Sequence, residues 1–199
     1  MPSVCLATED SLSESVGRRL IAEIGSHVEV GLTFRKNGFG YLKANIDKFC
    51  NVAQRSPLFL ITDLDKEKCA ALLISKWIGN RTLPENLVFR VAVREIEAWL
   101  LADHVGMKEL LGKGADKLPA DPDQLLDPKK SLLKFASGAP RAVRNDLLVE
   151  PGAVASQGLG YNQRLGEFVR NTWDPNRAAS CSNSLFRTLK RLQQLSDRL

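Results

Sequence analysis

The 199-residue sequence is poor in the side chains that bind zinc or form disulfide bonds. It contains two histidines and four cysteines, and no two cysteines form a CxxC pair. Zinc sites need such ligands at short, regular spacings, so the sequence argues against a structural zinc site. We expect free, partly buried thiols at Cys5, Cys50, Cys69 and Cys181.

Long apolar runs are also missing. No stretch approaches the roughly 18 consecutive apolar residues of a membrane span, and the N-terminal MPSVCLATED lacks a basic segment followed by a long apolar run. No internal repeat or low-complexity segment is present. With 44% hydrophobic and 26% charged residues, the composition predicts a globular, cytoplasmic protein with no membrane partner. The length suits one ordinary domain, or a domain with an appended lobe.

The charge is modest in sum but unevenly placed. The formal net charge is +5. Residues 1–110 contain 14 basic and 14 acidic side chains, whereas residues 111–199 contain 14 and 9. This asymmetry indicates a polyanionic partner for the C-terminal part. A solvated basic surface is the alternative.

Strand and helix patterns alternate over residues 1–111. Strands are predicted at SVCLA, HVEVGLTF, SPLFLIT and LPENLVFRVAV, and the helices between and after them include Lys66–Ile78 and REIEAWLLADHV. Such alternation predicts an α/β fold with a mainly parallel, four-stranded, Rossmann-like sheet flanked by helices. From about Gly112 onward the segments read as helices that begin at Asp-Pro pairs. We therefore expect a basic helical lobe, residues 112–199, packed on an α/β domain of residues 1–111.

Acidic residues follow three of the predicted strands. Glu9 follows the first strand, Asp63 and Asp65 the third, and Glu95 and Glu97 the fourth. Ligands of parallel sheets bind at the carboxyl ends of the strands, so these side chains are expected at one edge. Two extended residues one apart project to the same side, and paired carboxylates resist joint ionisation unless a cation compensates them. The DLD motif therefore predicts a Mg²⁺ or Mn²⁺ site. Solvated turn aspartates that cap the next helix are the alternative.

This combination resembles the Toprim domain of topoisomerases, primases and nucleases of the overcoming-lysogenization-defect class. The segment RVAVREIEAWLLAD, residues 90–103, also resembles the EAWLLAD signature of an uncharacterised bacterial family regarded as Toprim-like, often encoded beside ATPases and linked to phage defence. The resemblance covers most of the chain. It implies a Toprim-like fold in which Glu9 is the general acid or base and Asp63 and Asp65 bind the metal. Glu97 would be a further catalytic carboxylate. All four side chains, Glu9, Asp63, Asp65 and Glu97, are candidate ligands of the metal.

Each of these glutamates has an alternative. The stretch TEDSLSE lacks the glycine that is usual near a Toprim glutamate, so Asp10 and Glu14 also remain candidates for that role. The alternative for Glu9 is a first-turn acid favoured by the helix dipole. A surface Glu97 paired with Arg94 is the alternative to a ligand.

The function implied by the resemblance is a magnesium-dependent nuclease or phosphodiesterase that acts on nucleic acid with water as the nucleophile. Neither tyrosine, Tyr41 or Tyr161, is required, because both lie in predicted glycine-flanked loops and read as packing or stacking residues. A partner ATPase and a role in phage defence follow from the resemblance alone. The basic residues expected to contact nucleic acid are Lys129, Lys130, Lys134, Arg141, Arg144, Arg187, Lys190 and Arg191.

Two other classes of function remain open. A phosphohydrolase of the haloacid-dehalogenase type also uses DxD, but on its first strand and with Thr or Val at the position of Glu67. A non-catalytic adaptor or regulatory subunit, with a degenerate Toprim domain that binds an ATPase or nucleic acid, is the non-enzymatic alternative.

Overall fold

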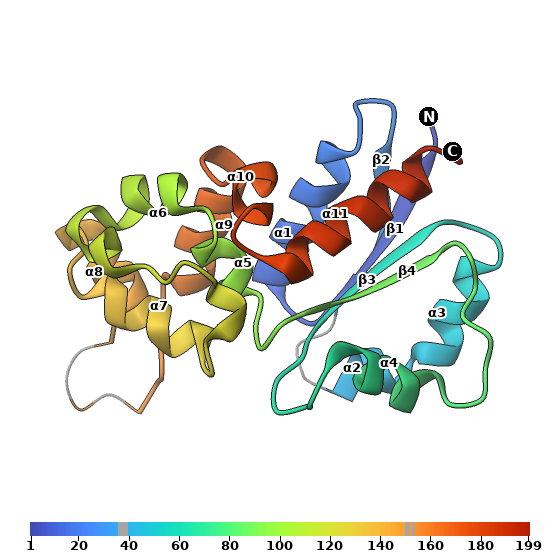
Figure 1. Cartoon of the computed structure of the whole chain (residues 1–199), viewed down its shortest axis with the longest axis horizontal. Helices are drawn as coiled ribbons and strands as arrows, with labels where there is room; N and C mark the ends of the chain where they lie inside the picture. The colour runs from blue at the N-terminus through green and yellow to red at the C-terminus, as the bar shows by residue number, and fades with distance from the viewer. Residues whose placement is uncertain (36–39, 150–151, 153) are drawn as a thin grey trace.

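The computed structural model describes residues 1–35, 40–149, 152 and 154–199. It contains a four-stranded, all-parallel sheet in the order β2-β1-β3-β4. The predicted α/β class and the helical C-terminal extension are confirmed (Figure 1). The strands are β1 (Ser3–Thr8), β2 (Glu29–Arg35), β3 (Leu58–Asp63) and β4 (Leu87–Ala92).

The sheet is covered on both faces. In Figure 1, α1 (Ser11–Glu23) and α11 (Asn183–Ser196) lie over one face, and α2 (Gly40–Ala44), α3 (Ile46–Ala53) and α4 (Ala70–Ile78) over the other. Alternate residues of each strand enter different cores. Phe59 and Ile61 belong to the core under α1 and α11, whereas Leu58 and Leu60 belong to the core over α3 and α4. Burial on both faces explains why the central strand reads as an unbroken apolar run.

Helix α1 illustrates how the sequence sets these contacts. Asp10 caps its N-terminus, since its Oδ1 accepts a hydrogen bond of 2.8 Å from the Ser13 backbone N–H. Gly17 lies where the helix crosses β1, and a Cβ atom there would come within 2.6 Å of Leu6 Cδ1. The glycine therefore lets α1 approach the sheet closely.

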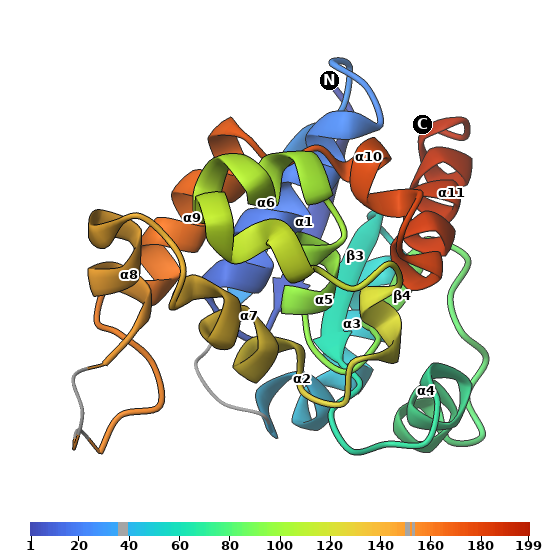
Figure 2. The same ribbon diagram turned by 60° about the vertical axis from the view of Figure 1, so that its left-hand side comes forward.

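The remaining helices gather beyond the carboxyl ends of β3 and β4 (Figures 1 and 2). They are α5 (Glu97–Leu101), α6 (His104–Leu111), α7 (Pro128–Ala136), α8 (Arg141–Leu147), α9 (Tyr161–Asn171) and α10 (Pro175–Ala179), with 3₁₀ helices η1 (Gly112–Lys117) and η2 (Pro122–Gln124). One apolar core runs from β1 through α5 to α9 and α11. The predicted division into two domains, residues 1–111 and 112–199, stays a prediction. The apolar core contains residues from both ranges. None of the described helices is both long and apolar enough to cross a bilayer.

Two predicted helices differ from those observed. The helix expected from Lys66 begins at Ala70, because the chain first makes a turn in which the Glu67 N–H bonds to the Leu64 carbonyl, and Cys69 is extended at the N-cap. The helix expected over REIEAWLLADHV is split in two, with Asp103 as the N-cap of α6. The apolar stretch Leu147–Val149 begins at the last residue of α8 and contains no strand. Residues 36–39 and 150 lie outside the described residues.

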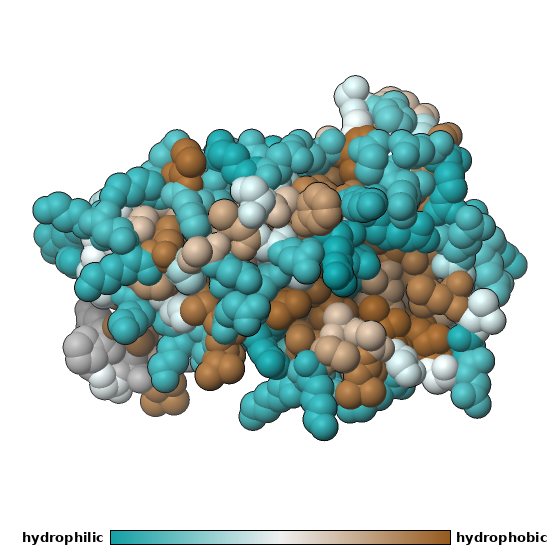
Figure 3. Space-filling model, in the orientation of Figure 1, coloured by the Kyte–Doolittle hydropathy of each residue, from teal (hydrophilic) through white to brown (hydrophobic). Residues whose placement is uncertain are grey.

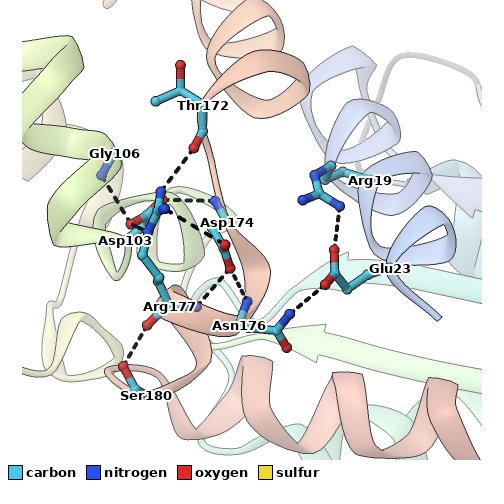
Figure 4. Close-up of polar contacts among 9 residues, drawn as sticks. All are labelled: Arg19, Glu23, Asp103, Gly106, Thr172, Asp174, Asn176, Arg177 and Ser180. Atoms are coloured by element: carbon cyan, nitrogen blue, oxygen red, sulfur yellow. Dashed lines mark hydrogen bonds and ion pairs between the residues drawn. The ribbon is translucent and has the colours of Figure 1, made fainter. Parts of the chain in front are cut away.

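The split is stabilised by an ion pair between a buried aspartate and an exposed arginine (Figure 4). Asp103 is fully buried and accepts two hydrogen bonds of 2.8 Å from Arg177 in α10. It also accepts bonds from the backbone N–H groups of Gly106 and Asp174. Burial alone would raise the pKa of Asp103, but these donors lower it below its usual range. The carboxylate is therefore ionised and joins α6 to α10. A second link in the same view joins α1 to α10, where Glu23 accepts a bond from Asn176.

We predict that Asp103→Ala lowers the free energy of unfolding by about 2–4 kcal/mol, because it removes the N-cap of α6 and leaves two backbone donors without their acceptor. Urea unfolding at neutral pH measures the loss. Lys108→Ala is the control, since it breaks the exposed Lys108–Asp116 pair and should cost at most about 1 kcal/mol. Equal losses in the two variants would contradict the assignment.

Candidate active site

The acidic residues lie where the chain order of the sheet reverses. β1 is bonded to β2 on one side and to β3 on the other, so the segments that follow β1 and β3 leave toward opposite faces. Such switch points are where parallel sheets bind ligands. Glu9 comes directly after β1, and Asp63 is the last residue of β3.

Asp63 is the most unusual residue of this edge. Its Oδ1 atom is buried and has no hydrogen-bond partner among the residues that the structure describes. Its pKa is raised well above the usual range, first by burial and then by the negative charges of Glu97 and Glu9. Asp10 and Asp65 add smaller contributions of the same sign. A carboxylate oxygen with no donor among four other carboxylates calls for a proton or a cation.

Glu9 contacts Thr62, the residue that precedes Asp63 in β3. The Thr62 hydroxyl donates a hydrogen bond to Glu9 Oε1. Burial raises the pKa of Glu9 and the bond from Thr62 opposes this, while the charge of Asp65 raises the pKa further. The structure thus brings Glu9 to the aspartates, and Thr62 is a contact that the sequence did not reveal.

The alternatives for the glutamate role have other partners. Asp10 lies near Asp63 but caps α1. Glu14 accepts bonds of 2.8 Å from Arg18 and 2.7 Å from Arg35, which lower its pKa although burial would raise it. An ionised carboxylate held by two arginines is a poor proton donor at neutral pH.

Asp65 is exposed, and its backbone is held in place by two hydrogen bonds to Arg94. Its N–H donates to the Arg94 carbonyl at 2.9 Å, and the Arg94 guanidinium donates to the Asp65 carbonyl at 2.9 Å. The positive φ of Asp65 means that the extended geometry expected for the DLD motif ends at Leu64. Same-side projection therefore does not explain the pairing of Asp63 with Asp65, although the two charges are close enough to raise the pKa of Asp63.

A pocket of about 640 Å³ adjoins Asp65. Leu64, Leu72 and Leu73 line it together with Trp77, and its basic side chains are Lys43, Lys66, Lys68 and Lys76. Lys76 is paired with Glu67 at 2.7 Å. No local sequence pattern links these lysines, because they come from three different segments.

Glu97 is the second buried carboxyl of the site. It opens α5, is 5% exposed, and accepts a hydrogen bond of 2.8 Å from the hydroxyl of Tyr161. Burial raises the pKa of Glu97 to about 7, while the bond from Tyr161 works in the opposite direction. The alternative of a surface pair with Arg94 is wrong, since Arg94 bonds to the carbonyls of Asp65 and Glu67.

Tyr161 was expected in a loop but is buried at the start of α9. The glycines of QGLGY place it there. A Cβ atom on Gly158 would come within 2.2 Å of the Asp146 carbonyl oxygen, so only glycine lets this turn pack against α8. The packing role expected for the tyrosine fits its burial, but the bond to Glu97 was not foreseen. Tyr41 lies in α2, with its ring 6.1 Å from that of Phe49.

Of the predicted basic residues, Lys129 reaches the acidic edge. Its backbone N–H donates to Glu95 Oε2 at 2.8 Å, and its ammonium lies 5.2 Å from the centre of the Tyr161 ring. Its charge lowers the pKa of Glu95 and Glu97 in part, against the larger effect of burial. Lys129 thus brings one positive charge to the site.

The other predicted basic residues lie on three helices. Lys130 and Lys134 are on α7, Arg141 and Arg144 on α8, and the remaining three on α11 are Arg187, Lys190 and Arg191. Within the described residues, none of the eight, Lys129 included, forms an ion pair with a carboxylate. Contact with nucleic acid stays a prediction for all eight.

The acidic side chains are not arranged as a complete metal site. Within residues 1–35, 40–149, 152 and 154–199, no three acidic, histidine or cysteine side chains are grouped closely enough to hold one ion. Thr62 and Tyr161 bind Glu9 and Glu97 instead. The unpartnered Asp63 Oδ1, next to the exposed Asp65, is the feature that fits a hard divalent cation, which prefers carboxylate oxygens and keeps several waters.

Comparison with known proteins gives no further guide. No family model matches the chain, and no curated protein or solved structure matches it either. The class of protein that the geometry defines is therefore an α/β protein with a buried acidic site at the switch point of its sheet.

We predict that Glu97→Gln stabilises the metal-free protein in a pH-dependent way. The folded pKa of Glu97 is raised above the unfolded value of 4.5, so the wild type loses stability as the pH rises from about 4.5 through about 7. Near pH 8 the variant should gain about 3 kcal/mol, and near pH 4.5 almost nothing. Urea unfolding in a chelator at both pH values measures this.

The matched control is Glu14→Gln, where the sign reverses. The lowered pKa of Glu14 contributes stability above its unfolded value, so this variant should be destabilised near pH 8. If Glu97→Gln follows the same pH dependence as Glu14→Gln, the buried acidic site is not as described.

Proposed function

We propose that the protein is a magnesium- or manganese-dependent phosphodiester hydrolase that acts on nucleic acid. The observation that carries this proposal is Asp63, whose buried Oδ1 lacks a partner and whose pKa is raised by burial and by its acidic neighbours. The resemblance to Toprim domains supplies the reaction class. It also supplies the finer proposals of a cytoplasmic location, an ATPase partner and a role in phage defence.

Asp63 and Asp65 would hold the cation. When bound, a divalent ion supplies polarisation of a phosphoryl oxygen and offsets charge on the leaving oxygen. The lysines of the pocket beside Asp65 and the ammonium of Lys129 would hold the neighbouring phosphates of the strand. The basic residues of α7 and α8 extend this surface.

Glu9 would move the proton between the attacking water and the leaving oxygen. Its raised pKa suits this role, because a general acid or base works best when its pKa is near the pH of the reaction. Thr62 orients its carboxyl group by a hydrogen bond to Oε1. Glu97 would stay protonated for part of the time at neutral pH, which limits the repulsion around Asp63.

Tyr161 is a positioning residue and not a nucleophile in this proposal. Its hydroxyl is buried and bound to Glu97, and burial and that carboxylate both raise its pKa. A phenolate is therefore strongly disfavoured. Water is the nucleophile that remains, which makes the proposed reaction hydrolysis.

A cleavage assay with paired binding measurements tests the proposal. Single- and double-stranded DNA and RNA are incubated with Mg²⁺ or Mn²⁺, and Mn²⁺ binding is followed by calorimetry. Glu9→Gln should lower the rate by about 10²–10⁴-fold while Mn²⁺ still binds. Asp63→Asn should abolish both binding and cleavage, yet unfold at higher urea without metal because it removes a buried charge.

Asp116→Asn is the control, as it changes an exposed aspartate that pairs with Lys108. It should leave cleavage and Mn²⁺ binding unchanged. Wild-type activity in Asp63→Asn and in Asp65→Asn would overturn the proposal.

A non-catalytic adaptor is the second candidate. It is favoured by the bonds that occupy Glu9 and Glu97 and by the lack of a grouped metal site in the described chain. A folded wild-type protein that binds no Mn²⁺ and cleaves none of the substrates would support the adaptor over the hydrolase.

A further inference from the structure

Strand β4 ends the sheet and leaves one edge open. Leu58 N–H donates to the Asn86 carbonyl, and Leu64 N–H donates to the Ala92 carbonyl. The backbone N–H and C=O groups of the even-numbered residues of β4 therefore point toward β3 and bond to it. Because successive residues of a strand point their backbone groups to opposite sides, those of Phe89 and Val91 face away from β3. No strand of the described chain pairs with this side.

A groove of about 650 Å³ runs beside this edge, and its two walls differ in chemistry. One wall is apolar and comes from α4, with Ala70, Ala71 and Ile74. The other wall comes from α11 and is basic, with Arg187, Lys190 and Arg191. Figure 3 shows apolar residues gathered on this face between the polar surface of α11 and the end of the molecule that carries α4.

The basic wall lacks acidic partners. Arg90 projects from β4 toward α11, where its Nε bonds to the Thr188 hydroxyl at 3.3 Å. Burial lowers the pKa of Arg90, and the charges of Arg187 and Arg191 lower it further. Among the described residues, none of these arginines forms an ion pair, and Asp123 at the end of the groove is bonded to Ser182 and Ser184. An anionic occupant would relieve this repulsion.

We propose that the groove binds an extended, acidic segment of a partner protein as a fifth strand of the sheet. The backbone of the segment pairs with Phe89 and Val91, its acidic side chains face Arg90, Arg187 and Arg191, and its apolar side chains face α4. Side chains of a strand alternate between faces, so the segment alternates acidic and apolar residues. Nucleic acid fits less well, because its sugar-phosphate backbone has no alternating N–H and C=O groups to pair with a strand edge. The proposal does not depend on catalysis at Asp63.

Fluorescence anisotropy with labelled peptides on the full chain tests this surface. The probe is a peptide of alternating glutamate and valine, and its control has the same composition with the glutamates in one block. The alternating peptide should bind roughly tenfold more tightly than the blocked one, and Arg187→Glu with Arg191→Glu should remove the difference. Equal binding of the two peptides would overturn the proposal.

Two further peptides test backbone pairing without changing the protein. One is N-methylated on its valines and the other on its glutamates. Only one set of N–H groups faces β4, so one peptide should keep its affinity and the other should lose roughly tenfold. Equal affinities would show that charge alone drives binding and would overturn strand addition. Tighter binding of an eight-nucleotide oligothymidine, with displacement of the peptide, would assign the surface to nucleic acid instead.

Discussion

The buried carboxyl group of Asp63 is the constraint around which the site is organised. It ends a strand whose other five residues are all buried, has one oxygen without a donor, and is surrounded by the charges of Glu97, Glu9, Asp10 and Asp65. An uncompensated group of this kind opposes folding. The rest of the molecule holds it in place, since β3 is buried on both faces and packs into both cores.

The residues around Asp63 come from both halves of the chain. Glu9 and Thr62 belong to the α/β part, whereas Tyr161 and Lys129 belong to the helical part and contact Glu97 and Glu95. The C-terminal helices therefore complete the site rather than extend the fold. The ion pair between the buried Asp103 and Arg177 fixes α10 against the start of α6 and thereby supports this arrangement.

The parts of this structure that depend on local pattern could be predicted from the sequence. Apolar runs ending in acidic residues located β3, Asp63 and the edge of the sheet, because burial on both faces dictates such runs. Contacts between distant segments could not be predicted. Tyr161 and Glu97 are 64 residues apart, and Asp103 and Arg177 are 74 apart. The first contact changed the interpretation of a glycine-rich loop, and the second divided a predicted helix.

The negative charge of Asp63 can be neutralised by a proton or by a cation, and the two cases imply different roles for the acidic residues. If a proton neutralises it, the raised pKa values of Asp63 and Glu97 only limit the cost of burying the two carboxyl groups, and asparagine and glutamine would give a more stable fold at neutral and higher pH. If a cation neutralises it, the repulsion among the carboxylates becomes the source of affinity, because binding removes the charge that opposed folding. Sequences that break a rule of folding at one site usually do so for function. The second explanation is the one we propose, and it would account for why carboxylates, and not amides, occupy this edge.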